Sequence, residues 1–155
     1  MRRDLRDEIK QRRPFGSAEQ EAQLNLERTA AVLGHAFADA LKRYGITPTQ
    51  FNVLRILRGA GSEGLCRNEV RDRMIAQVPD VTRLLDRLEE AGLVERERLT
   101  TDRRQVATRI TDKGLALLAE LDEPVATMHK RALGHMTPEQ LATLTELLTI
   151  ARGGL

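Results

Sequence analysis

Apolar residues recur at three- and four-residue spacing over most of the chain, and this period predicts helices. The first helix should begin at residues 17–20, whose Ser-Ala-Glu-Gln sequence is a capping box, and end before Gly45. The second should begin at residues 47–50, Thr-Pro-Thr-Gln, and end at the glycines of residues 59–61. The amino-terminal half is therefore expected to be helical.

The period then changes to a short, β-branched alternation over two stretches, which is typical of paired strands. The turn-forming residues between these stretches indicate a hairpin tip. The remaining elements are expected to be a short helix over residues 67–74, a helix over 79–91, strands over 93–98 and 105–110 with the tip at 99–104, and long helices from Thr111 and from Thr137.

This order of elements predicts a mainly α fold with a small β-hairpin wing. A short helix, a turn, a second helix and a basic hairpin are the parts of a winged helix-turn-helix. The second helix is then the candidate for reading DNA. We expect no large sheet, because only the hairpin shows a strand period.

The helix over residues 79–91 carries an apolar face at offsets 0, 3, 4 and 7, formed by Val81, Leu84, Leu85 and Leu88. That face must pack inward, so the polar face is free for another partner. The amino-terminal end of such a helix reaches base edges, and its free N–H groups favour phosphate. The candidate DNA contacts here are Gln77, Asp80, Thr82, Arg83 and Arg87.

The hairpin tip supplies a second candidate contact. Arg103 and Arg104 stand on a two-stranded protrusion that is long enough to enter a minor groove, and arginine suits that narrow, negative groove. Asp102 is adjacent and is placed to orient one of the two arginines. Alone, these three residues would be no more than a solvated turn; beside a helix-turn-helix they indicate DNA contact.

Composition refines this interpretation. The chain has 155 residues, enough for one domain with a core, and its aromatic content of 3% suits a helical protein. The net charge is +2, and residues 67–109 hold ten arginines against nine acidic residues. Attraction to DNA must therefore depend on where individual arginines lie and not on total charge.

Several classes of function are excluded or disfavoured. Cys66 is the only cysteine, so neither an intramolecular disulfide nor a multi-cysteine zinc site is possible. No phosphate loop, nucleophile elbow or metal-ligand pair stands out, so we expect no enzyme activity, no cofactor and no metal. No apolar run approaches the roughly 20 residues of a membrane span, and the amino terminus lacks a signal-peptide pattern, so a cytoplasmic protein is expected.

The sequence resembles the MarR family of transcription regulators. The resemblance lies in residues 81–96, VTRLLDRLEEAGLVER, in the Asp-Arg-Arg of residues 102–104 and in the Ile-Thr-Asp-Lys-Gly of residues 110–114, and it extends over about residues 17–152. It implies an obligate homodimer that binds double-stranded DNA at pseudo-palindromic sites. It further implies an N-terminal arm (1–16), a helical dimerisation region (17–46 and 112–155) and a winged helix-turn-helix DNA-binding region (47–111).

The resemblance also implies a regulator, expected here to be a repressor, that a small-molecule effector relieves. Family members bind effectors near the first helix, so the candidate pocket residues are His35, Phe37, Tyr44 and Phe51, although each also suits an ordinary core or surface role. His35, His129 and His135 do not match the metal-binding clusters of zinc-sensing members.

Two alternatives remain open at this point. One is a winged-helix module that binds protein partners and not DNA, which the intact Arg103-Arg104 tip disfavours. The other is a thiol switch through Cys66. Peroxide-sensing members carry their reactive cysteine in the first helix, whereas Cys66 precedes the short helix, so their mechanism does not carry over.

Overall fold

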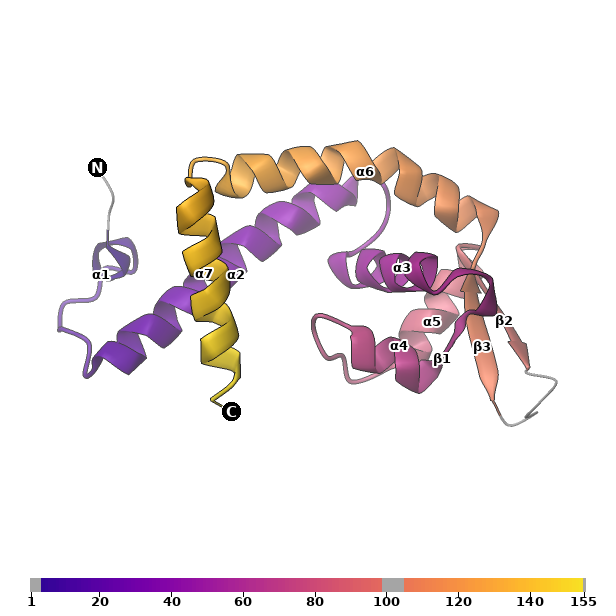
Figure 1. The fold of residues 1–155 in the computed structure, drawn as a ribbon, viewed down its shortest axis with the longest axis horizontal. Helices are drawn as coiled ribbons and strands as arrows, with labels where there is room; N and C mark the ends of the chain where they lie inside the picture. The colour runs from indigo at the N-terminus through magenta and orange to yellow at the C-terminus, as the bar shows by residue number, and fades with distance from the viewer. Residues whose placement is uncertain (1–3, 99–104, 155) are drawn as a thin grey trace. The chain divides into compact units, whose positions relative to one another are not determined.

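The computed structural model describes residues 4–98 and 105–154 (Figure 1). The chain divides into two compact units, Met1–Asp39 and Ala40–Leu155, and each is described by itself. The wing tip, with Asp102, Arg103 and Arg104, lies outside the described residues.

The first unit contains α1 (Leu5–Glu8) and most of α2 (Ala18–Lys42). Leu5 is buried, and Arg28 of α2 pairs with Glu8 at 3.5 Å. The expected start of α2 is confirmed, since the Ser17 hydroxyl accepts a hydrogen bond from the backbone N–H of Gln20. The reciprocal bond differs from a capping box, because the Gln20 side chain accepts from the N–H of Gly16.

Helix α3 (Pro48–Ala60) supplies much of the core of the second unit. Its start is a complete capping box, in which Thr47 Oγ1 accepts from Gln50 N at 3.2 Å and Gln50 Oε1 accepts from Thr47 N at 2.9 Å. The sequence predicted this start correctly. One face of the helix is buried, namely Phe51, Val53, Leu54 and Leu57.

A three-stranded antiparallel sheet follows, in the order β1-β3-β2 (Figure 1). Strands β2 (Val94–Arg98) and β3 (Val106–Ile110) are the predicted hairpin. Strand β1 (Leu65–Cys66) was not predicted, because two residues form a strand only through pairing with Thr108 and Ala107 of β3. A short 3-10 helix, η1 (Gly61–Glu63), precedes it.

Two more helices form the helix-turn-helix and two close the chain. Helices α4 (Arg67–Arg73) and α5 (Val81–Glu90) match the expected pair, and α5 begins two residues after Pro79. Helix α6 (Asp112–Leu133) contacts α3 and buries Leu118 and Leu121. Helix α7 (Pro138–Arg152) begins at a second complete capping box and has no buried residue among those described. The predicted fold class, a mainly α winged helix-turn-helix, is confirmed.

Candidate nucleic-acid interface

Helix α5 presents a polar surface because its apolar residues are used in the core. Val81, Leu85 and Leu88 are at most 6% exposed, and Leu84 is half-buried. Thr82, Arg83 and Arg87 are exposed on the other side of the helix. The apolar face of α5 is therefore buried and its polar face is exposed, as predicted.

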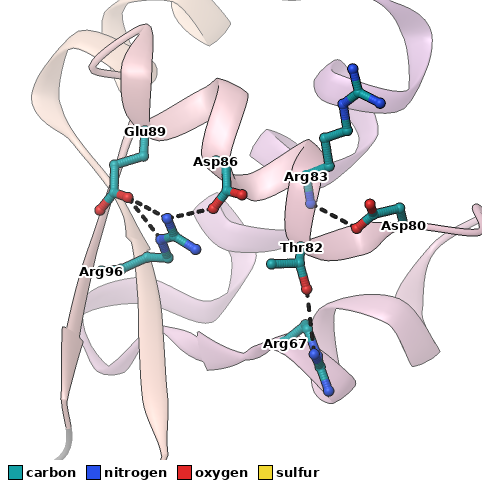
Figure 2. Close-up of polar contacts among 7 residues, drawn as sticks. All are labelled: Arg67, Asp80, Thr82, Arg83, Asp86, Glu89 and Arg96. Atoms are coloured by element: carbon teal, nitrogen blue, oxygen red, sulfur yellow. Dashed lines mark hydrogen bonds and ion pairs between the residues drawn. The ribbon is translucent and has the colours of Figure 1, made fainter.

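Asp80 fixes where this helix begins. Its Oδ1 accepts a hydrogen bond of 2.9 Å from the backbone N–H of Arg83, so it is the N-cap of α5 (Figure 2). A carboxylate at this position satisfies one of the free N–H groups and complements the helix dipole. The structure thus gives Asp80 a role in building the helix, whereas its predicted contact with DNA stays a prediction.

The carboxyl end of α5 is tied to the start of α6. Gly92 has a φ of +71°, which ends the helix, and Leu93 N donates to Leu88 O at 2.9 Å. Lys113 Nζ donates to the carbonyl oxygen of Ala91 at 2.7 Å, and Thr111 Oγ1 donates to that of Gly92 at 2.7 Å. These bonds hold the angle between α5 and the following elements.

Gly114 explains why α6 can lie so close to the wing. A Cβ at this position would lie 2.4 Å from the carbonyl oxygen of Leu93 and 2.7 Å from Cγ1 of Ile110. Only glycine allows this approach without displacement of the backbone. The close packing of α6 against Leu93 and Ile110 therefore explains why the Ile-Thr-Asp-Lys-Gly segment ends in glycine.

Arg96 of β2 joins the wing to α5. Its Nη2 lies 2.5 Å from Glu89 Oε2 and 2.6 Å from Asp86 Oδ1, and its Nε donates to Glu89 Oε2 at 2.9 Å (Figure 2). The hydrogen bond from Arg96 lowers the pKa of Glu89, and the bond to Glu89 raises the pKa of Arg96. Two carboxylates of α5 therefore share one guanidinium, and the three side chains together carry one net negative charge.

The arginines around α5 fall into two groups. Four have acidic partners: Arg71 with Asp72, Arg73 with Glu69, Arg96 with Asp86 and Glu89, and Arg109 with Glu97. Among the described arginines of residues 67–109, four others make no ion pair, and these are Arg67, Arg83, Arg87 and Arg98. Three of those four lie on α4 and α5. A nearly neutral segment thus leaves uncompensated positive charge at the candidate interface.

Arg67 at the start of α4 contacts α5 directly. Its Nη1 donates to Thr82 Oγ1 at 3.3 Å (Figure 2). Arg67 was not among the predicted contacts, because its bond joins residues fifteen apart through the packing of two helices and no spacing rule predicts it. Gln77 is exposed in the loop before α5, where the N–H of Ile75 donates to Asn52 Oδ1 at 3.0 Å.

The predicted effector residues are not all brought together. Tyr44 lines a cavity of about 380 Å³ with Leu93, Lys113 and Glu120, whereas Phe51 is 5% exposed in the core and does not line it. His35 and Phe37 belong to the first unit. His35 is exposed and lies 3.4 Å from Asp39, and Phe37 is half-buried.

Cys66 lies half-buried at the N-cap of α4. Its Sγ is 3.4 Å from Gln105 Oε1, and its backbone N–H donates to Glu69 Oε2 at 2.8 Å. Across residues 4–98 and 105–154, no group of three His, Cys, Asp or Glu side chains is placed to hold a metal ion. None of the helices in these ranges combines the length and apolar character that crossing a membrane requires.

Comparison with known proteins agrees with this architecture. The MarR family model matches residues 46–106. The chain is 30% identical to the HTH-type transcriptional repressor MdtR of Bacillus subtilis over 77% of this chain and 76% of that protein. It is 39% identical to a MarR transcription factor from Planctomyces limnophilus, with a TM-score of 0.68, over 88% of this chain and 99% of that one.

A third match is a mutant of MarR from E. coli complexed with operator DNA. It is 25% identical and has a TM-score of 0.78, over 96% of this chain and 99% of that one. The chain belongs to the MarR family. Its relatives are transcription regulators, in agreement with the expectation that it is not an enzyme.

Proposed function

We propose that this protein is a cytoplasmic, sequence-specific DNA-binding transcription regulator that acts as a homodimer on a pseudo-palindromic operator. The observation that carries the proposal is the start of α5, where Thr82 and Arg83 are exposed while the apolar face of the helix is buried. A helix presented in this way fits the major groove with its amino-terminal residues toward the bases.

The distribution of charge supports the same function. Arg67, Arg83 and Arg87 lie on the two helices of the helix-turn-helix and make no ion pair with a described residue. The wing strands lead toward Arg103 and Arg104, which we propose as minor-groove contacts, with Asp102 beside them. The match to a MarR protein complexed with operator DNA adds support.

The homodimer and the division of labour belong to the same proposal. We assign residues 47–111 to DNA binding and residues 17–46 and 112–155 to dimerisation, with residues 1–16 as an arm. Helix α7 buries no described residue and exposes Leu147 and Ile150, which suits contact with a second copy. Two α5 helices in one dimer would address half-sites roughly 34–36 Å apart.

Repression relieved by a small effector is the final part of the proposal. A dimer seated on an operator blocks a promoter, and the relative MdtR is named as a repressor. The cavity beside Tyr44 is lined by Ala91 and Lys113, whose mutual hydrogen bond ties the carboxyl end of α5. A ligand in this cavity would therefore disturb the carboxyl end of α5. Tyr44→Ala should weaken the response of operator binding to the effector.

Selection of bound duplexes from a random DNA pool tests the central proposal. Enrichment of a pseudo-palindrome with two half-sites is expected from the native protein, and its affinity should exceed that for a scrambled duplex. No enrichment at low salt would favour a winged-helix module that binds protein partners.

A second comparison tests the thiol-switch alternative. Mild peroxide should leave operator binding by the native protein and by Cys66→Ser equally strong. Loss of binding on oxidation in the native protein alone would establish the thiol switch.

A further inference from the structure

Arg67 is exposed at the first position of α4, outside the set of residues that the sequence indicated as DNA contacts. We propose that Arg67 is a further DNA contact, which binds a backbone phosphate and at the same time positions Thr82 for base reading. This inference rests on the proposed function, since it assigns roles within the same interface.

The hydrogen-bond chemistry of the pair fixes the role of Thr82. Arginine is only a donor, so in the 3.3 Å contact the Thr82 hydroxyl must be the acceptor. A threonine hydroxyl has one proton to donate, and the Thr82 side chain makes no other hydrogen bond with a described residue. The proton is therefore available to an acceptor on a base edge, such as guanine N7 or O6, adenine N7 or thymine O4.

The unused N–H donors of Arg67 suit a phosphate. A guanidinium has five N–H donors in a fixed planar fork, and only one is used on Thr82. Three carboxylates of α4 and α5 have other partners: Glu69 accepts from the N–H of Cys66, and Asp86 and Glu89 pair with Arg96. Since Arg67 makes no ion pair with a described residue, most of its donors are available to an anion.

The two contacts act together. With one nitrogen on α5 and the others on the DNA backbone, Arg67 would set how deeply the start of α5 enters the groove. A lysine at this position would keep the charge but lose the planar fork, because its ammonium is a point charge on a flexible stem. Charge and geometry can therefore be separated by substitution.

The test is a double-mutant cycle on the operator selected from the random pool. Arg67→Ala, Thr82→Val and the double variant are titrated against operator and scrambled duplex at several salt concentrations. Arg67→Ala should weaken operator binding about tenfold and reduce the slope of log K against log salt by about one. Thr82→Val should cost less in the Arg67→Ala background than alone, because its orientation is already lost.

Arg67→Lys separates the two roles and guards against a folding artefact. It should retain the salt slope of the native protein but show the same loss of coupling to Thr82 as Arg67→Ala. The matched control is Arg55→Ala, which removes the same charge from the exposed surface of α3 and should leave the slope unchanged. Thermal unfolding of each variant confirms that it is folded.

The outcomes distinguish this inference from the function on which it depends. Absence of operator binding by the native protein would refute the proposed function. Native binding with an unchanged affinity and salt slope in Arg67→Ala would overturn the inference and leave the function standing. Additive effects of the two substitutions would refute the positioning of Thr82.

Discussion

Arg96 on β2 donates two hydrogen bonds to Glu89 Oε2 on α5, from Nε at 2.9 Å and from Nη2 at 2.5 Å. The same guanidinium reaches Asp86, one turn earlier on the helix, at 2.6 Å. The pairing ties α5 to strand β2 of the wing, in addition to the hydrogen bonds at the carboxyl end of α5. The Arg96 side chain is only 25% exposed, which strengthens its bonds relative to those of a fully solvated pair.

Removal of this connection should destabilise the fold. Arg96→Ala leaves two carboxylates without their partner, and we expect a loss of about 1–2 kcal/mol in the free energy of unfolding. Urea denaturation followed by circular dichroism measures it. Arg98→Ala, two residues along the same strand, removes an arginine without a described ionic partner and should change the free energy by less than about 0.5 kcal/mol. Equal losses in the two variants would contradict the assignment.

The same pair predicts a dependence of stability on pH. Folding lowers the pKa of Glu89 below its ordinary value of 4.5, because Arg96 donates hydrogen bonds to it. Its contribution is therefore complete above the ordinary pKa and is lost as the pH falls through the folded value. Urea midpoints measured from about pH 6 to about pH 3 should fall less steeply in Glu89→Gln than in the native protein.

An internal control follows from the geometry. In an Arg96→Ala background the hydrogen bonds that lower the pKa of Glu89 are gone. Adding Glu89→Gln to that background should therefore leave the acid dependence unchanged. If Glu89→Gln still made the acid dependence of stability less steep in that background, a group other than Arg96 would be lowering the pKa of Glu89.

Gly114 should not tolerate a methyl group. Because an alanine Cβ would lie 2.4 Å from Leu93 O, Gly114→Ala should cost about 1–3 kcal/mol in the free energy of unfolding. Gly59→Ala is the matched control, since its Cβ would meet nothing within 4 Å on the exposed surface of α3. That change should stabilise the protein by about 0.5–1 kcal/mol. Denaturation of both variants gives the comparison.

Local chemistry made some of these elements predictable from sequence. The Thr-Pro-x-Gln starts at Thr47 and Thr137 form the expected reciprocal hydrogen bonds, because all four groups lie within three residues of each other. The apolar offsets of α5 similarly identified the buried face. Such features need no knowledge of the rest of the chain.

Other features depend on tertiary contacts and were missed. Strand β1 exists through pairing with β3, about forty residues away, and the contact of Arg67 with Thr82 depends on how α4 packs on α5. The sequence indicated Asp80 only as a DNA contact, whereas its carboxylate caps α5. The predicted grouping of four effector residues rested on resemblance, and of these only Tyr44 lines a described cavity.

Arg83 and Arg104 should contribute to DNA binding in different ways. Arg83 is exposed at the start of α5, so Arg83→Ala should cost about 1–3 kcal/mol of binding free energy and relax base preference at one position per half-site. Arg104→Ala should weaken binding to many sequences alike and reduce the salt slope by about one. Titrations against operator and scrambled duplex at several salt concentrations separate the two. An unchanged slope in Arg104→Ala would mean that the wing does not contact DNA.

Helix α7 provides the test of the proposed homodimer. Leu147 is 58% exposed and Ile150 is 64% exposed, and large apolar side chains left in water favour association with a second copy. Their replacement by glutamate, Leu147→Glu with Ile150→Glu, should place charges in the proposed interface and shift the protein toward monomer or unfolded chain. Thr145→Glu carries its charge on the opposite, exposed side of the helix, at 100° per residue, and should leave the dimer intact. Sedimentation at micromolar concentration measures the mass of each variant. A folded monomer in the native protein would refute the homodimer, and an unchanged mass in the double variant would place the interface elsewhere on the chain.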